Sequence, residues 1–109
     1  TLSIHDALPI LYGKTNMVMM RDIKYFESRG RHIIINLVDN QSIQYVGQLK
    51  NEIKKLPLNF VEIGKSYIIN LKHMRECHVS YVVMDDGKEL GISRAYRNYF
   101  NEKILEYNS

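Results

Sequence analysis

The sequence predicts a mostly antiparallel β domain with two short helices. Short segments rich in β-branched and aromatic residues follow one another along the chain, which is typical of strands. Turn-forming residues such as Asp39-Asn40 and Asp85-Asp86-Gly87 separate them, and two stretches repeat apolar residues at helical spacing. The chain of 109 residues has the length of one domain, and 45% hydrophobic residues suffice for a core of its own.

The strands are expected mainly after residue 15. Residues 1–14 mix Pro9, Gly13 and short apolar pieces, so they are either the end of an interdomain linker or a leading edge strand. The domain proper is then expected over residues 15–109. The predicted strands span residues 17–21, 23–28, 32–38, 42–46, 60–63, 67–70, 74–78, 79–84 and 89–92.

Two segments carry the helical period. The first helix is expected over residues 47–56, because apolar side chains recur there at spacings of three and four, and Pro57 ends it. The second is expected over residues 94–106, behind Ser93 as the candidate N-cap. We expect its aromatic stripe, which ends at Tyr107, to pack in the core and not to stack on bases. The charged side chains expected in solvent on the first helix are Lys50, Glu52, Lys54 and Lys55.

Composition and charge indicate the cellular compartment of the protein and the charge of its partner. Cys77 is the only cysteine, so no intrachain disulfide can form, and a free thiol favours the cytoplasm. No apolar run approaches the roughly 20 residues that span a bilayer, so no membrane segment is expected. The net charge of +3 and the pI near 9.0 suit an anionic partner.

Motifs for chemistry or metal binding are missing from the sequence. Gly64-Lys65-Ser66 looks like the end of a phosphate-binding P-loop, but Asn59 stands where that motif needs glycine and a strand follows the serine. His73, Cys77 and His78 have no second pair of zinc ligands at the usual spacing. We therefore expect no enzyme, no cofactor and no metal.

Basic residues gather where predicted elements meet. Arg29 and Arg31 flank a glycine between two strands, and an arginine fork matches both phosphate oxygens and the guanine edge. Lys65 lies in a second break, and Arg94 and Arg97 stand at the start of the last helix, where an anion such as a DNA phosphate would offset their charge. Alternatively, these are solvated turns of a β-rich module that binds protein or peptide.

Four segments carry a more specific pattern: DIKYFES (22–28), VGQLK (46–50), FVEIGKSYIINL (60–71) and DGKELGISR (86–94). They closely resemble LytTR domains, the DNA-binding domains of bacterial response regulators, from about residue 16 to residue 107. The resemblance implies an elongated sandwich of antiparallel sheets that serves as the output domain of a transcriptional regulator. It also implies a receiver domain in the same full-length chain and directly repeated promoter sites in double-stranded DNA, with a dimer on DNA as one arrangement.

The resemblance assigns roles to the same three junctions. His32, Lys65 and either Arg94 or Arg97 fall where the family places base-reading residues. Many members have a histidine where this chain has Gly64, so Lys65 is expected to take over more of that contact. The residues expected to contact DNA are Arg29, Arg31, His32, Lys65, Ser66, Arg94 and Arg97.

Overall fold

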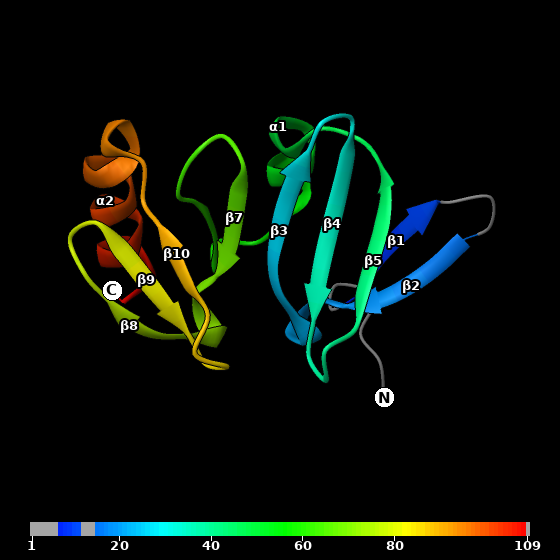
Figure 1. Ribbon diagram of the computed structural model, residues 1–109, viewed down its shortest axis with the longest axis horizontal. Coiled ribbons are helices and arrows are strands. Elements are labelled where there is room, and N and C mark those ends of the chain that lie inside the picture. Colours follow the sequence, from blue (N-terminus) through cyan, green and yellow to red (C-terminus); the bar gives the residue numbers. More distant parts are fainter. Residues whose placement is uncertain (1–6, 12–14, 109) are drawn as a thin grey trace.

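Three antiparallel sheets form the framework of the computed structural model, which describes residues 7–11 and 15–108 (Figure 1). The predicted fold class, mainly β with a mid-chain and a C-terminal helix, is confirmed. In chain order the elements are β1 Ala7–Leu11, β2 Thr15–Met19, the 3-10 turn η2 Met20–Asp22, β3 Ile23–Arg29, β4 His32–Leu37, β5 Ser42–Val46, α1 Leu49–Glu52, η3 Ile53–Lys55, β6 Phe60–Glu62, β7 Tyr67–Asn70, η4 Leu71–His73, β8 Met74–Cys77, β9 Tyr81–Met84, β10 Glu89–Gly91, η5 Arg94–Tyr96 and α2 Arg97–Tyr107.

The five-stranded sheet, in the order β5-β4-β3-β7-β6, is the middle layer of the molecule. Successive residues of a strand face opposite sides of a sheet, and here they enter two different cores. Phe26 and Ile68 belong to a core shared with β4, β5 and α1, whereas Tyr25 and Ile69 belong to one shared with β9, β10 and α2. A slip of β3 or β7 by one residue would exchange their side chains between the two cores, so the register is fixed by the packing on both faces.

Two short turns have the conformations that their residues favour. Asp39 and Asn40 both have positive φ, 61° and 58°, as a type I′ turn between β4 and β5 requires. Gly87 has φ of 90° in the turn between β9 and β10. The turns predicted from Asp39-Asn40 and Asp85-Asp86-Gly87 are therefore present.

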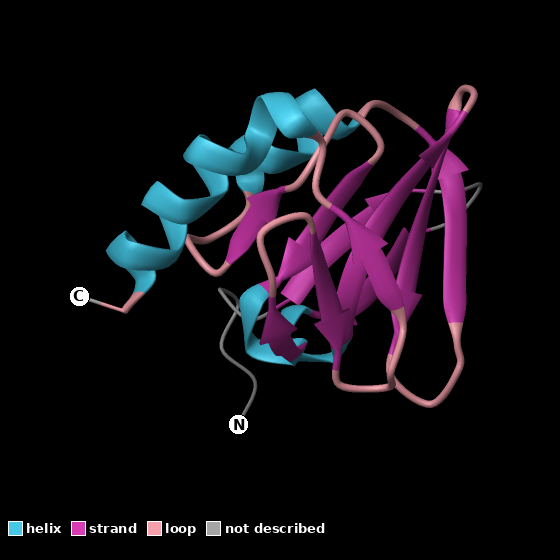
Figure 2. Cartoon of the chain, turned by 60° about the vertical axis from the view of Figure 1, so that its left-hand side comes forward, coloured by secondary structure: helices cyan, strands magenta, loops and turns pink. Residues whose placement is uncertain are grey.

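The predicted elements differ from the observed ones mainly at their ends. The first expected strand ends at Met19 and continues as η2, and residues 79 and 80 are a bend before β9. Of the stretch 1–14, residues 7–11 form β1, which pairs with β2, and residues 1–6 and 12–14 lie outside the described residues. Both helices lie toward one end of the molecule, with the 3-10 turns η2 and η4 at the opposite end (Figure 2).

Two expectations about the helices need correction. Glu52 was expected in solvent but is only 8% exposed, because α1 packs this carboxylate toward Tyr45 of β5. Burial, followed by the charge of Glu52, raises the pKa of the Tyr45 phenol. In α2, Phe100 is fully buried as expected, but Tyr107 at the end of the aromatic stripe is exposed.

Asn70 is a fully buried amide that joins three segments. Its Oδ1 accepts hydrogen bonds from Asn59 Nδ2 at 2.7 Å and from the backbone amide of Lys72 at 3.0 Å. Its Nδ2 donates to the carbonyl oxygen of Ile23 at 2.9 Å. One side chain at the end of β7 thus fixes the start of β3, the residue before β6 and the turn η4.

The three-stranded sheet is tied to the middle layer by its acidic turn. Lys24 of β3, whose side chain is 9% exposed, donates to Asp86 Oδ2 at 2.5 Å. This hydrogen bond is the largest cause that lowers the pKa of Asp86. Next to it, the His73 ring lies between Asp85 Oδ2 at 2.7 Å and the Arg21 carbonyl oxygen at 2.5 Å.

Replacing Asn70 with alanine should lower the free energy of unfolding by about 2–4 kcal/mol, because buried donors and acceptors lose their partners. Urea unfolding followed by circular dichroism measures the change. Asn101→Ala, an exposed position of α2, serves as the matched control and should shift stability by less than about 0.5 kcal/mol. Equal losses in the two variants would contradict the role given to Asn70.

Asp86→Asn should destabilise the fold by about 1 kcal/mol at neutral pH, a value kept small by solvent screening because the Asp86 side chain is 38% exposed. A carboxylate whose pKa is lowered on folding stabilises the protein above its unfolded pKa, and this contribution disappears as pH falls through the folded pKa. The difference between wild type and Asp86→Asn in urea unfolding should therefore shrink in acid. Asp39→Asn, an exposed turn carboxylate, is the control, and a difference that persisted unchanged in acid would argue against the ion pair.

Candidate nucleic-acid interface

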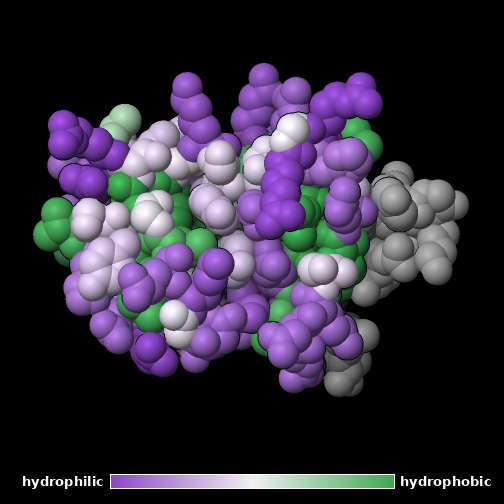
Figure 3. All heavy atoms as spheres, in the orientation of Figure 1, coloured by the Kyte–Doolittle hydropathy of each residue, from purple (hydrophilic) through white to green (hydrophobic). Residues whose placement is uncertain are grey.

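Four connecting segments meet at one edge of the molecule, which we call the basic edge (Figure 1). They are the β3–β4 turn with its flanking residues (29–32), the β5–α1 junction (46–50), the β6–β7 loop (63–66) and the segment that leads into α2 (92–97). The acidic turns β4–β5 and β9–β10 lie at the opposite edge. Hydrophilic side chains project at several places along the basic edge, with a few hydrophobic ones between them (Figure 3).

The β3–β4 turn projects two arginines. Gly30 has φ of +57°, which suits the first central residue of a type II′ hairpin turn, and Arg31 follows it. Arg29 is 69% exposed in its side chain and donates from Nε to Glu27 Oε2 at 2.8 Å. This hydrogen bond raises the pKa of the Arg29 guanidinium, and it leaves the outer nitrogen atoms toward solvent. His32 is half-buried at the first position of β4.

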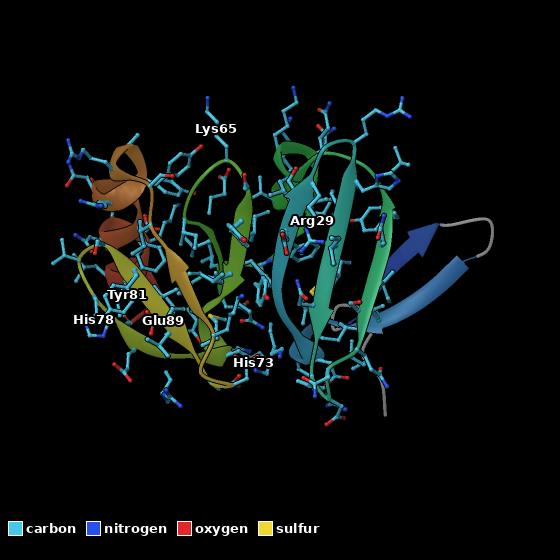
Figure 4. All side chains as sticks on the ribbon, in the orientation of Figure 1. Arg29, Lys65, His73, His78, Tyr81 and Glu89 are labelled. Carbon is cyan, nitrogen blue, oxygen red and sulfur yellow. The ribbon has the colours of Figure 1, made fainter. Side chains whose placement is uncertain are left out.

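The β6–β7 loop presents Lys65 and Ser66, both exposed, and Figure 4 shows Lys65 pointing away from the molecule. Gly64 is buried, and a Cβ atom there would lie 2.8 Å from Ser93 Oγ. The backbone amide of Ser93 donates to the Ile63 carbonyl oxygen at 2.8 Å. The glycine at this position, where the family often has histidine, thus lets the loop pack directly against the segment before α2.

The two arginines near the start of α2 differ in exposure and in hydrogen bonding. Arg94 is exposed, whereas Arg97 is half-buried and donates from Nε to the Ile92 carbonyl oxygen at 3.4 Å. Ser93 takes the N-cap position of η5, where the sequence predicted it, but its side chain makes no capping hydrogen bond. α2 itself begins only at Arg97, after that turn.

Main-chain hydrogen bonds join the four segments in sequence across the edge. Gly47 donates to the Arg31 carbonyl oxygen at 3.1 Å, and Ser28, next to the turn, donates to the Ser66 carbonyl oxygen at 2.9 Å. The bond from Ser93 to Ile63 completes the series. The relative positions of Arg31, Lys65 and Arg94 are therefore set by backbone contacts and not by mobile side chains.

Two adjoining hollows show which residues the edge brings together. Lys65 lines the first with Gly30, Lys50 and Tyr96, and it lines the second with residues on both sides of Arg94, namely Ser93 and Ala95. All seven residues predicted to contact DNA lie on or beside this edge. They differ in availability, because Arg29 and Arg97 are already bound within the protein.

Sequence analysis missed two contributors to the edge. Lys50 was assigned to a solvated helix face, but it lines the same hollow as Lys65. The antiparallel pairing of β4 with β5 could have indicated the position of Lys50. It places the end of β5, which leads into α1, beside the start of β4 and its hairpin turn. Glu27 was also missed, and only its position two residues before Arg29 on the same face of a strand hints at the ion pair.

Among residues 7–11 and 15–108, no group of three or more His, Cys, Asp or Glu side chains could hold a metal ion. Within the same residues, every helix is too short or too polar to cross a membrane.

Comparisons with known proteins agree with the geometry. A family model described as the LytTr DNA-binding domain matches residues 13–105. Among solved structures, the LytTr DNA-binding domain of a protein described as a methyl-accepting/DNA response regulator from Bacillus cereus is similar, with 19% sequence identity and a TM-score of 0.77. The likeness covers 91% of this chain and 96% of that one, and at this identity it shows a shared fold. No curated protein matches the chain.

The conformation of Gly30 allows a test of the β3–β4 turn. A Cβ atom at this position would meet nothing within 4 Å, so the cost of a side chain lies in the backbone alone. Gly30→Val should lower the free energy of unfolding by about 1–2 kcal/mol, whereas Gly30→Asn should cost clearly less, because asparagine tolerates positive φ. Urea unfolding of the two variants gives the comparison, and equal midpoints would refute the assigned turn.

Proposed function

Since this chain belongs to the LytTR family of DNA-binding domains, we propose that it binds specific sequences of double-stranded DNA as the output domain of a bacterial transcriptional regulator. The resemblance seen in the sequence is confirmed by the family match over residues 13–105. Binding to DNA without chemical conversion is the expected activity, so no catalytic residue is assigned.

The observation that carries the proposal is the fixed spacing of exposed cations along one edge. Arg31, Lys65 and Arg94 are exposed, and none of their side chains has a hydrogen-bond or ion-pair partner among residues 7–11 and 15–108. Their segments follow one another along the longest axis in Figure 1, over the part of the molecule from α2 to β4, and the β1–β2 hairpin extends beyond them. Cations in a row on one edge can meet the phosphates of a duplex that lies along that edge.

The side chains of the edge divide into two groups by their freedom to move. Flexible, unpaired cations such as Lys65 and Arg94 suit phosphate oxygens and can also reach base edges. Arg29 is held by Glu27, and His32 lies in the sheet, so each offers its donors in a narrower range of directions. We assign base reading to His32, Lys65 and one arginine, and phosphate contact to the remaining cations.

The finer biological setting belongs to the same proposal. A receiver domain in the same full-length chain would control this output domain, and directly repeated promoter sites would place two copies side by side on DNA. Such a regulator would work in the cytoplasm, where promoters lie and where the thiol of Cys77, exposed and unpaired in the structure, stays reduced.

Replacing Lys65 with alanine should weaken binding to a selected duplex by about 1–3 kcal/mol and reduce the salt dependence of the affinity, because one cation no longer releases counterions. Mobility-shift titrations at several salt concentrations measure both quantities. Lys88→Ala is the matched control, since it removes the same charge from the acidic edge. It should change the affinity far less.

A combined Arg29, Arg31 and Lys65 to alanine variant separates DNA binding from the alternative of a protein- or peptide-binding module. A DNA-binding domain should keep its circular dichroism spectrum and lose duplex binding. An affinity without salt dependence in the wild type, or the same loss from Lys88→Ala as from Lys65→Ala, would contradict the proposal.

A further inference from the structure

Val46 is an apolar side chain that is largely exposed at the basic edge. It is 67% exposed, whereas most β-branched residues of the described strands are buried. It lines a hollow with Gly30 and Arg31, next to the hairpin turn that carries the arginines. An isopropyl group exposed among cations does not stabilise the isolated domain. An apolar side chain at this place suits contact with a partner that binds to the basic edge.

The strand register places Val46 in a row with two residues of the proposed interface. Arg29 of β3 pairs with His32 of β4, and His32 pairs with Val46 of β5. Directly paired residues point to the same face of a sheet, so the three side chains lie side by side on the face opposite to buried Tyr45. Adjacent strands are about 4.8 Å apart, so the row extends about 10 Å, close to three base-pair steps.

The ends of the row are held in place. Arg29 is bonded to Glu27, and Gly47, directly after Val46, donates its backbone amide to the Arg31 carbonyl oxygen at 3.1 Å. A Cβ atom on Gly47 would lie 3.1 Å from Ile33 Cδ1, so the chain packs closely against the hairpin at this point. Valine itself has few rotamers. Contact with a ligand would therefore require little further ordering.

We infer that Val46 is a specificity-determining residue that contacts the C5-methyl group of a thymine in the major groove, beside the base read by His32. This inference rests on the proposed DNA-binding function. Thymine is the one base whose major-groove edge carries an apolar group, and proteins recognise it through apolar contact. The row then offers a guanidinium, an imidazole and an isopropyl group to neighbouring base pairs.

The test removes the methyl group from the DNA. A duplex with the highest affinity is first selected from random DNA, and each thymine in turn is replaced by deoxyuridine, which lacks only that methyl. At one thymine the wild-type affinity should fall about fourfold, as expected for one buried methyl group. Val46→Ala should bind the thymine and uracil duplexes equally, and selection with this variant should lose the thymine preference at that position.

Val79→Ala is the matched control, because Val79 is 82% exposed in the bend between β8 and β9, away from the basic edge, and this variant should keep the fourfold difference. Urea unfolding checks that Val46→Ala is folded. Suppose that the wild type binds DNA through Lys65. The inference about Val46 is then overturned if wild type and Val46→Ala respond alike to every uracil, or if Val46→Ala selects the same bases. In either case the proposed function stands. If no duplex binds in a salt-dependent manner, the proposed function itself fails.

Discussion

Main-chain hydrogen bonds across the basic edge are the constraint on which the functional interpretation depends. Like charges on exposed loops repel one another, and flexible loops would separate them at little cost. Here the bonds from Gly47 to Arg31, from Ser28 to Ser66 and from Ser93 to Ile63 fix the distances between the loops through the backbone. A ligand that meets several cations at once then avoids the entropy cost of ordering the loops, which binding would otherwise have to offset.

The frame beneath these bonds is the five-stranded sheet, whose central strands are buried on both sides. Its basic end carries the loops, and its opposite end carries the acidic turns and the Asn70 network. Unpaired cations that gather at one end orient a domain as it approaches a polyanion, an effect on the association rate more than on final affinity. At the opposite end, Lys24 and His73 bind the carboxylates of the β9–β10 turn. At the basic end, Glu27 pairs with Arg29, and Glu62 lines the same hollow as Lys65.

Much of this arrangement could be predicted from the sequence, because the strands obey local rules. β5 and β7 have the predicted bounds, since β-branched residues and flanking turns define them. The three basic junctions were also visible as cations beside glycine or serine. The burial of Glu52, the amide network of Asn70 and the turned-in Arg97 were not predictable, because each depends on a residue distant in sequence or on a packing angle. Val46 was predicted at the end of the strand over residues 42–46, but only the strand pairing places it beside His32.

The contact between Gly64 and Ser93 shows how base reading and loop geometry limit each other. Any side chain at position 64 would bring a Cβ to 2.8 Å from Ser93 Oγ, so the serine hydroxyl would have to rotate away. A histidine at this position would add a polar group to the loop, whereas glycine lets the loop approach the segment that carries Arg94. Lys65 then stands between two hollows, one toward the β3–β4 turn and one toward Ser93. Under the proposed function, a flexible cation at that junction can serve either neighbour, whereas His32 is held in the sheet, so we expect more of the specificity from the row that includes His32.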